Sequence, residues 1–276
     1  MLYSLSCPLL HKFIQGREKG DEAMSKKIWI ISHKHLKIGI LTVIACCILL
    51  FSLLVSPSFL TVFSSKEEPR AFYRADIEEK KVALTFNISW GEERALPIVD
   101  ILRDKEVEAT FFISGAWAER HPEIVEKIVE NGHTLGNHGF QHKKYTDMEE
   151  EEIIRDLHLS HKKIKDVTEQ DVTYFRPPFG ELNKEVLSIV ERFGYSTIHW
   201  SVEGNDWNNP GKEQIITSIT EKIQPGDVIL LHASDSAKQT GDSLPSLIDR
   251  IREKGYEFVS LEELITQAET EVKEIK

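Results

Sequence analysis

Two histidines, His138 and His142, stand four residues apart and directly follow a short apolar stretch. Two imidazoles at this spacing can ligate one divalent cation if the segment between them turns helical. The cysteines, Cys7, Cys46 and Cys47, all lie far upstream, so a metal near the histidines needs nitrogen and oxygen ligands. Taken alone, the pair is explained equally well as exposed loop histidines without a ligand.

Arg176, His232 and the pair Asp206-Trp207 are further candidates for catalytic or binding residues. Arg176 precedes two prolines, whose fixed backbone angles aim the arginine and the amides that follow. His232 ends an apolar run and can donate a proton to a leaving group near neutral pH. Asp206 can supply a carboxylate that tunes this histidine, and Trp207 a flat ring that packs on a sugar. The alternatives are a rigid surface loop, a core histidine and an ordinary surface turn.

Elements that alternate along the chain must position these residues. Helix-like stretches separate short apolar runs at 82–86, 110–113, 134–137, 173–176, 196–200, 228–231 and 257–260. This alternation predicts a parallel α/β domain, either a barrel or an open sheet. Both architectures gather ligands at the carboxyl ends of their strands. Because Asn87, Arg176 and the histidines each follow a predicted strand, we expect them to converge on one rim.

The N-terminal part of the chain predicts a membrane anchor. Residues 38–55 carry no charge, and apolar residues continue to 63, which is long enough for a membrane-spanning helix. Lysines precede this run, so the positive-inside tendency places the N-terminus in the cytoplasm and the following domain outside. We expect a cytoplasmic tail at 1–37, an uncleaved transmembrane anchor at 38–63 and a linker at 64–79. A cleaved signal peptide, and a start at Met24 instead of Met1, are alternatives.

The charge of the exported part argues against nucleic acid as a partner. The whole chain has a formal net charge of -11, but its first 66 residues are basic. The remaining residues are therefore more acidic than the total suggests. Such a domain repels a phosphate backbone and lacks the basic stripe that nucleic-acid binding requires.

The ordered set of motifs is similar to that of the polysaccharide deacetylases with a NodB-homology domain. The motifs are Thr85-Phe86-Asn87, His138-x-x-x-His142, Arg176-Pro177-Pro178-Phe179-Gly180, Asp206-Trp207 and Leu230-Leu231-His232. The segments 85–91 and 116–122 are also similar to the sporulation-associated PdaB-type subgroup. The resemblance runs from about 80 to 265, leaves a charged tail at 266–276, and implies a distorted (β/α) barrel.

The resemblance also implies an activity, which is metal-dependent hydrolysis of N-acetyl groups on a cell-wall glycan such as peptidoglycan. A divalent cation, zinc with cobalt and nickel as alternatives, would bind His138 and His142, polarise the acetamide carbonyl and activate water. His232 would protonate the leaving amine, Arg176 would hold the catalytic carboxylate, and Asp206 would tune His232. The amide of Phe179 would stabilise the oxyanion. Substrate contacts are expected from Pro178, Phe179, Trp207, Leu230 and Trp90.

Two positions depart from the family pattern. The family usually has two consecutive aspartates, the first a general base and the second a metal ligand, and this chain has Asn87 and Ile88 in their places. An amide cannot accept a proton at neutral pH, and isoleucine cannot bind a cation. Loss of a general base typically costs about 10²- to 10⁴-fold in rate. Three hypotheses stay open. The first is a slow deacetylase in which metal-bound hydroxide needs no protein base, or in which Glu92 or Glu93 stands in for it. The second is a catalytically silent glycan-binding or scaffold protein at the cell or spore envelope, and the third is a structural envelope protein.

Overall fold

The computed structural model describes residues 70–274, with side chains through residue 268. The expected cytoplasmic tail, the transmembrane anchor at 38–63 and the first residues of the linker lie outside the described residues. Among the helices in the described part of the chain, none is long and apolar enough to cross a membrane. The predicted anchor and the predicted location of the domain therefore stay predictions.

Residues 70–274 contain one nine-stranded sheet in which the named strands pair in parallel. The strand order is β1-β6-β5-β4-β3-β2-β8-β7, and β9 also pairs with β2. The strands are β1 (Ala71–Phe72), β2 (Lys81–Ile88), β3 (Ala109–Ile113), β4 (Thr134–Asn137), β5 (Tyr174–Phe175), β6 (Ser196–Ile198), β7 (Val202–Glu203), β8 (Val228–His232) and β9 (Glu257–Phe258).

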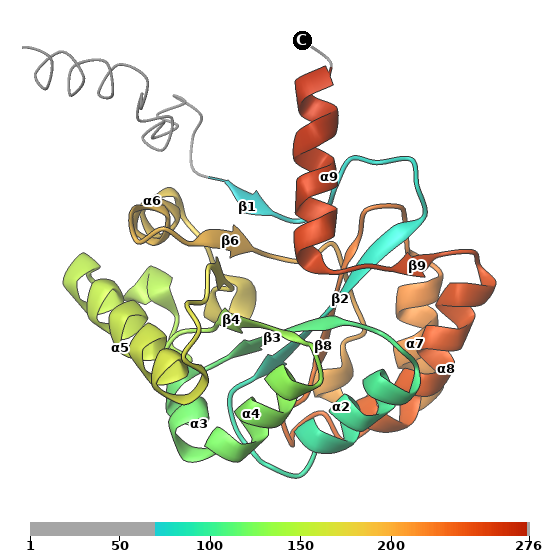
Figure 1. Ribbon diagram of the computed structural model, residues 1–276, viewed down its shortest axis with the longest axis horizontal. Helices are drawn as coiled ribbons and strands as arrows, with labels where there is room; N and C mark the ends of the chain where they lie inside the picture. The colour runs from blue at the N-terminus through green and yellow to red at the C-terminus, as the bar shows by residue number, and fades with distance from the viewer. Residues whose placement is uncertain (1–69, 275–276) are drawn as a thin grey trace, which may run out of the picture. The chain divides into compact units, whose positions relative to one another are not determined.

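Helices surround the sheet in an open, distorted α/β barrel (Figure 1). They are α2 (Ala95–Asp104), α3 (Gly115–Arg120), α4 (Pro122–Glu130), α5 (Glu150–Thr168), α6 (Lys184–Arg192), α7 (Lys212–Thr220), α8 (Thr240–Glu253) and α9 (Leu261–Glu274). Short 3-10 turns are η1 (Tyr145–Asp147), η2 (Pro178–Gly180) and η3 (Asp206–Asn208). The predicted barrel is confirmed. Strands β1 and β7 and helix α3 were not predicted, and α9 continues through most of the expected tail.

Strand β2 shows how the sequence builds the barrel. Its side chains alternate between two faces, as in any strand. Val82, Phe86 and Ile88 belong to the large apolar core formed with the surrounding helices. Thr85 and Asn87 point the other way and both accept hydrogen bonds from a buried arginine. Because both faces are covered, the strand is buried along nearly its whole length.

Residues 70–75 lie within the segment expected to be a linker, yet they pack on the barrel. Strand β1 pairs with β6, with Ala71 opposite Thr197. The Arg74 guanidinium lies 2.5 Å from the buried carboxylate of Asp227, and Ala75 is buried. Figure 1 shows β1 beside β6 at the edge of the sheet. The ordered domain therefore begins before residue 80.

Candidate active site

The carboxyl ends of the strands bring the predicted chemical residues together. Asn87 on β2 and His232 on β8 are opposite each other in the parallel register. Arg176, just after β5, donates from Nη1 to Asn87 Oδ1 at 3.1 Å. His138, just after β4, lies 2.7 Å through Nδ1 from the carbonyl oxygen of Arg176. The ring of His142 is 4.8 Å from that of His138, measured between centroids. Residues far apart in sequence thus meet at one rim.

The histidine pair is arranged with one ring nitrogen free. A carbonyl oxygen only accepts, so His138 Nδ1 carries the hydrogen and Nε2 is left with a lone pair. This Nε2 is buried and has no hydrogen-bond partner within the described residues. Burial, and next the neighbouring His142, hold the pKa of His138 well below its ordinary value, and burial lowers the pKa of His142. Both rings are therefore neutral near pH 7, which is the state that binds a metal.

The loop between the two histidines is held by residues that the sequence pattern did not single out. The Gly139 amide donates to Asn137 Oδ1 at 2.9 Å, and Ser160 Oγ donates to the Gly139 carbonyl at 3.0 Å. The Phe140 amide donates to Asp156. Ser160 and Asp156 lie one turn apart on α5. This helical spacing is the feature of the sequence that could have indicated that they hold the same loop.

Arg176 is completely buried, and within residues 70–268 its hydrogen-bond partners include no carboxylate. Its guanidinium donates to Thr85 Oγ1 at 2.9 Å, to Asn87, and to the carbonyl of His199 at 2.8 Å. The ring of Phe112 stacks 4.0 Å from the guanidinium carbon. Burial lowers the pKa of Arg176 well below its ordinary value. A cation solvated only by neutral oxygens and a ring face is costly, since a buried charge is normally paired.

His232 is fixed by Asp206, as the sequence pattern suggested for these two residues. Its Nδ1 donates to Asp206 Oδ1 at 2.9 Å, and its backbone amide donates to Asp206 Oδ2 at 2.7 Å. Thr240 Oγ1, which the sequence reasoning missed, donates to the same Oδ2 at 2.6 Å. With three donors on one buried carboxylate, the ring is held in one tautomer, and Nε2 is left to exchange protons.

Comparison with known proteins agrees with this geometry. Residues 74–198 match the family model described as polysaccharide deacetylase. The chain is 31% identical to a peptidoglycan-N-acetylglucosamine deacetylase of Bacillus cereus, over 72% of this chain and 95% of that protein. The chain belongs to the polysaccharide deacetylase family.

Solved structures of the family include a protein without activity. The chain superposes with a TM-score of 0.68, at 32% identity, on BA3943 of Bacillus anthracis, described as a CE4 family pseudoenzyme. The match covers 72% of this chain and 69% of that one. A mutant of BA3943 described as having restored enzymatic activity superposes equally well, with 72% of each chain covered. The fold of this chain is therefore shared by active and inactive proteins.

Members of the polysaccharide deacetylase family are typically metal-dependent, and the histidine pair fits a cation in part. The Nε2 atom of His138 is buried without a hydrogen-bond partner among the described residues, and the ring of His142 lies beside the His138 ring. Ile88, by contrast, packs in the core between β2 and the helices. In the described part of the chain, no group of three or more His, Cys, Asp or Glu side chains could hold a metal. Among the described residues, the site therefore offers two histidine ligands and no third ligand of these types.

Three exposed aromatic rings, Phe179, Trp90 and Trp207, follow site residues closely in the sequence. Phe179 adopts a left-handed backbone conformation with φ of 60°, and its ring lies 4.5 Å from that of His142. Trp90 and Trp207 are both more than half exposed.

Three other predicted residues are placed as follows. Pro178 and Leu230 are buried, so any contact they make with substrate is by a limited surface. The carboxylate of Glu92 lies 3.5 Å from His121 Nδ1, and its amide donates to Asp235. These contacts give Glu92 a structural role and do not support it as a substitute base.

Proposed function

We propose that this protein is a metal-dependent polysaccharide deacetylase that hydrolyses N-acetyl groups of a cell-wall glycan such as peptidoglycan, with a site weakened by Asn87 and Ile88. The observation that carries the proposal is the buried, unpartnered Nε2 of His138 beside His142, with the His232–Asp206 pair at the carboxyl end of β8 on the same rim. The relative named as a peptidoglycan deacetylase supports the choice of glycan.

In this proposal the residues divide the work. His138 and His142 would hold a divalent cation, which supplies polarisation of the acetamide carbonyl and a more acidic bound water. His232, with Nδ1 committed to Asp206, uses Nε2 to pass a proton to the leaving amine. Arg176 positions the side chain of residue 87 through its 3.1 Å hydrogen bond.

Asn87 is the weak point of this machinery. Its amide oxygen accepts a hydrogen bond from Arg176 but cannot accept a proton at neutral pH. The site therefore lacks the base that would take a proton from the attacking water. The missing general base predicts a rate about 10²- to 10⁴-fold lower than in a complete site.

The decisive experiment is Asn87→Asp in the full chain, measured as acetate release from chitooligosaccharides and peptidoglycan fragments with zinc, cobalt and nickel. Arg176 would keep the new carboxylate ionised, so we expect release to rise by about 10²-fold or more. Asn131→Asp is the matched control, because it adds the same charge at the end of α4. The hydrolase function is wrong if neither the natural chain nor Asn87→Asp releases acetate with any of the three metals.

A second candidate is a catalytically silent, glycan-binding member of the family. It is favoured by the core position of Ile88 and by the 32% identity to a protein described as a pseudoenzyme. It predicts affinity for wall glycans without turnover in the natural chain. Trp207→Ala or Trp90→Ala should then lower that affinity, since both rings are exposed and follow Asp206 and Asn87 closely in the sequence.

We also propose that the domain is carried outside the cytoplasmic membrane by the segment at 38–63, and that it acts at the cell or spore envelope. The support is the uncharged run in the sequence and the similarity of 85–91 to the sporulation-associated subgroup. Fusing a reporter enzyme that is active only outside the cytoplasm to residue 276 tests this topology. An inactive reporter would exclude it.

A further inference from the structure

Gly180, the residue after Phe179, connects the site to a second group of rings. The segment after Phe179 packs on two more rings, because Gly180 has no side chain: a Cβ there would lie 2.5 Å from Trp200. His199 Nε2 lies 3.1 Å from the Gly180 carbonyl oxygen and donates to it. The rings of His199 and Trp200 are stacked, with centroids 3.9 Å apart and planes 11° apart.

The line of rings ends at Tyr73. The Tyr73 ring lies 4.5 Å from that of His199, with the planes inclined by 35°. Tyr73 is 47% exposed and Phe179 57% exposed, whereas His199 and Trp200 between them are partly buried. We call Phe179, Trp200, His199 and Tyr73 the ring track. Its two ends therefore present ring surface to solvent, and its middle is supported by the barrel.

The topology places the whole ring track on the same rim as the candidate active site. Strand β1 pairs in parallel with β6, with Phe72 opposite Ile198, so Tyr73 and His199 both follow the carboxyl end of a strand. Trp200 also reaches toward the site, since its ring lies 5.7 Å from the guanidinium carbon of Arg176. Carboxyl ends of parallel strands share one side of the barrel. The ring track therefore lies on that side of the barrel, with Phe179 beside His142 and Tyr73 just after β1.

The chemistry of the ring track suits an uncharged ligand with flat apolar faces. Burial lowers the pKa of His199, so this ring is neutral near pH 7. Lys144 places a cation over the Phe179 ring, but its charge is paired with Glu181 at 2.5 Å. A pyranose presents a C–H face that packs on an aromatic ring, and an exposed, pre-positioned ring binds at little entropic cost.

We propose that the ring track binds further pyranose units of the glycan, beyond the unit whose acetamide lies at the histidine pair. This inference rests on the proposed function and deepens it: the protein recognises a chain of several sugars. Tyr73 is then a binding residue that belongs to the segment expected to be a linker.

The test is calorimetric binding of N-acetylglucosamine monomer, dimer and tetramer to the full chain. We expect the natural chain to bind the tetramer more tightly than the dimer, and Tyr73→Ala to bind the tetramer about tenfold more weakly with little change for the dimer. Tyr73→Phe keeps the ring and should keep the affinity. Phe193→Ala is the matched control, because this ring is 39% exposed at the end of α6.

Melting temperatures of all variants show that each is folded. The proposal is overturned if Tyr73→Ala binds the tetramer as the natural chain does, if Tyr73→Phe is as weak as the alanine variant, or if the natural chain binds no length or all lengths equally. Acetate release by Asn87→Asp decides the proposed function separately, so loss of the ring track leaves the hydrolase function standing.

Discussion

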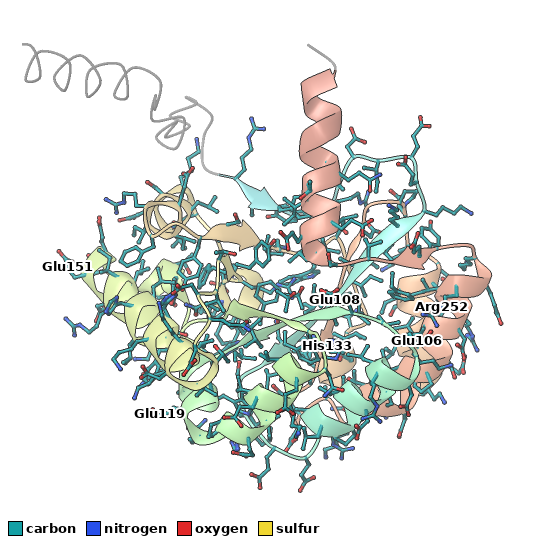
Figure 2. The ribbon with its side chains drawn as sticks, in the orientation of Figure 1. Glu106, Glu108, Glu119, His133, Glu151 and Arg252 are labelled. Atoms are coloured by element: carbon teal, nitrogen blue, oxygen red, sulfur yellow. The ribbon has the colours of Figure 1, made fainter. Side chains whose placement is uncertain are left out.

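His133 should make this domain markedly less stable in mild acid. The residue precedes β4, is 6% exposed, and has both ring nitrogens buried without a hydrogen-bond partner among the described residues (labelled in Figure 2). The ring of Phe111 lies 5.3 Å away. Removal from water lowers the pKa of His133 to about 4. The folded protein therefore keeps this imidazole neutral where the unfolded chain protonates it.

The size of the effect follows from that difference in proton affinity. The pKa of His133 changes from 6.5 in the unfolded chain to about 4 in the folded protein. At roughly 1.4 kcal/mol for each pKa unit, this change corresponds to about 3 kcal/mol of unfolding free energy. Because the pKa of His133 is lower in the folded state, the stability that depends on its neutral ring is fully present above pH 6.5. It is lost as the pH falls from 6.5 to about 4, where the folded protein also takes up the proton.

The measurement is urea unfolding of the natural chain and His133→Phe at several pH values between 7 and 4. Phenylalanine has no polar atoms, so the variant should be more stable by about 1–2 kcal/mol at pH 7. The gap should widen by about 3 kcal/mol at pH 4. His158→Gln, on the exposed face of α5, is the control and should leave the pH dependence unchanged. A gap that stays constant from pH 7 to pH 4 refutes the reasoning.

Two further substitutions test the site and the edge of the barrel. Asp206→Asn weakens the contacts with His232 and Thr240, so the unfolding free energy should fall by about 2–3 kcal/mol. When Asp206→Asn is added to Asn87→Asp, acetate release should also fall. Unchanged acetate release would contradict the role given to Asp206. Gly226→Ala would bring a Cβ within 1.9 Å of the Ala75 carbonyl oxygen and should cost more than about 3 kcal/mol in urea unfolding. Gly132→Ala, also at φ of 80° but in open space, is the control and should cost only about 1–2 kcal/mol. If the two glycine variants lose the same unfolding free energy, residues 70–75 do not pack on the barrel.

Local patterns in the sequence were sufficient for the alternation of elements and for the motifs of the site. Apolar runs at 82–86 and 228–231 predicted strands because buried parallel strands are apolar on both faces. The spacing of His138 and His142, and the place of Arg176 before two prolines, identified the residues that the strand ends bring together. The amide of Asn87, at a position where the family has a carboxylate, is likewise a feature of the sequence alone.

Tertiary structure decided what depends on partners distant in the chain. Strand β1 forms because Ala71 meets Thr197 and Arg74 meets Asp227, and nothing in the short segment 70–75 by itself signals such pairing. His133 looks like any histidine in the sequence until packing removes both of its nitrogens from water. Short-range patterns record which residues favour burial or an extended backbone, but only the closed fold determines which distant side chains meet and which polar atoms are left without a partner.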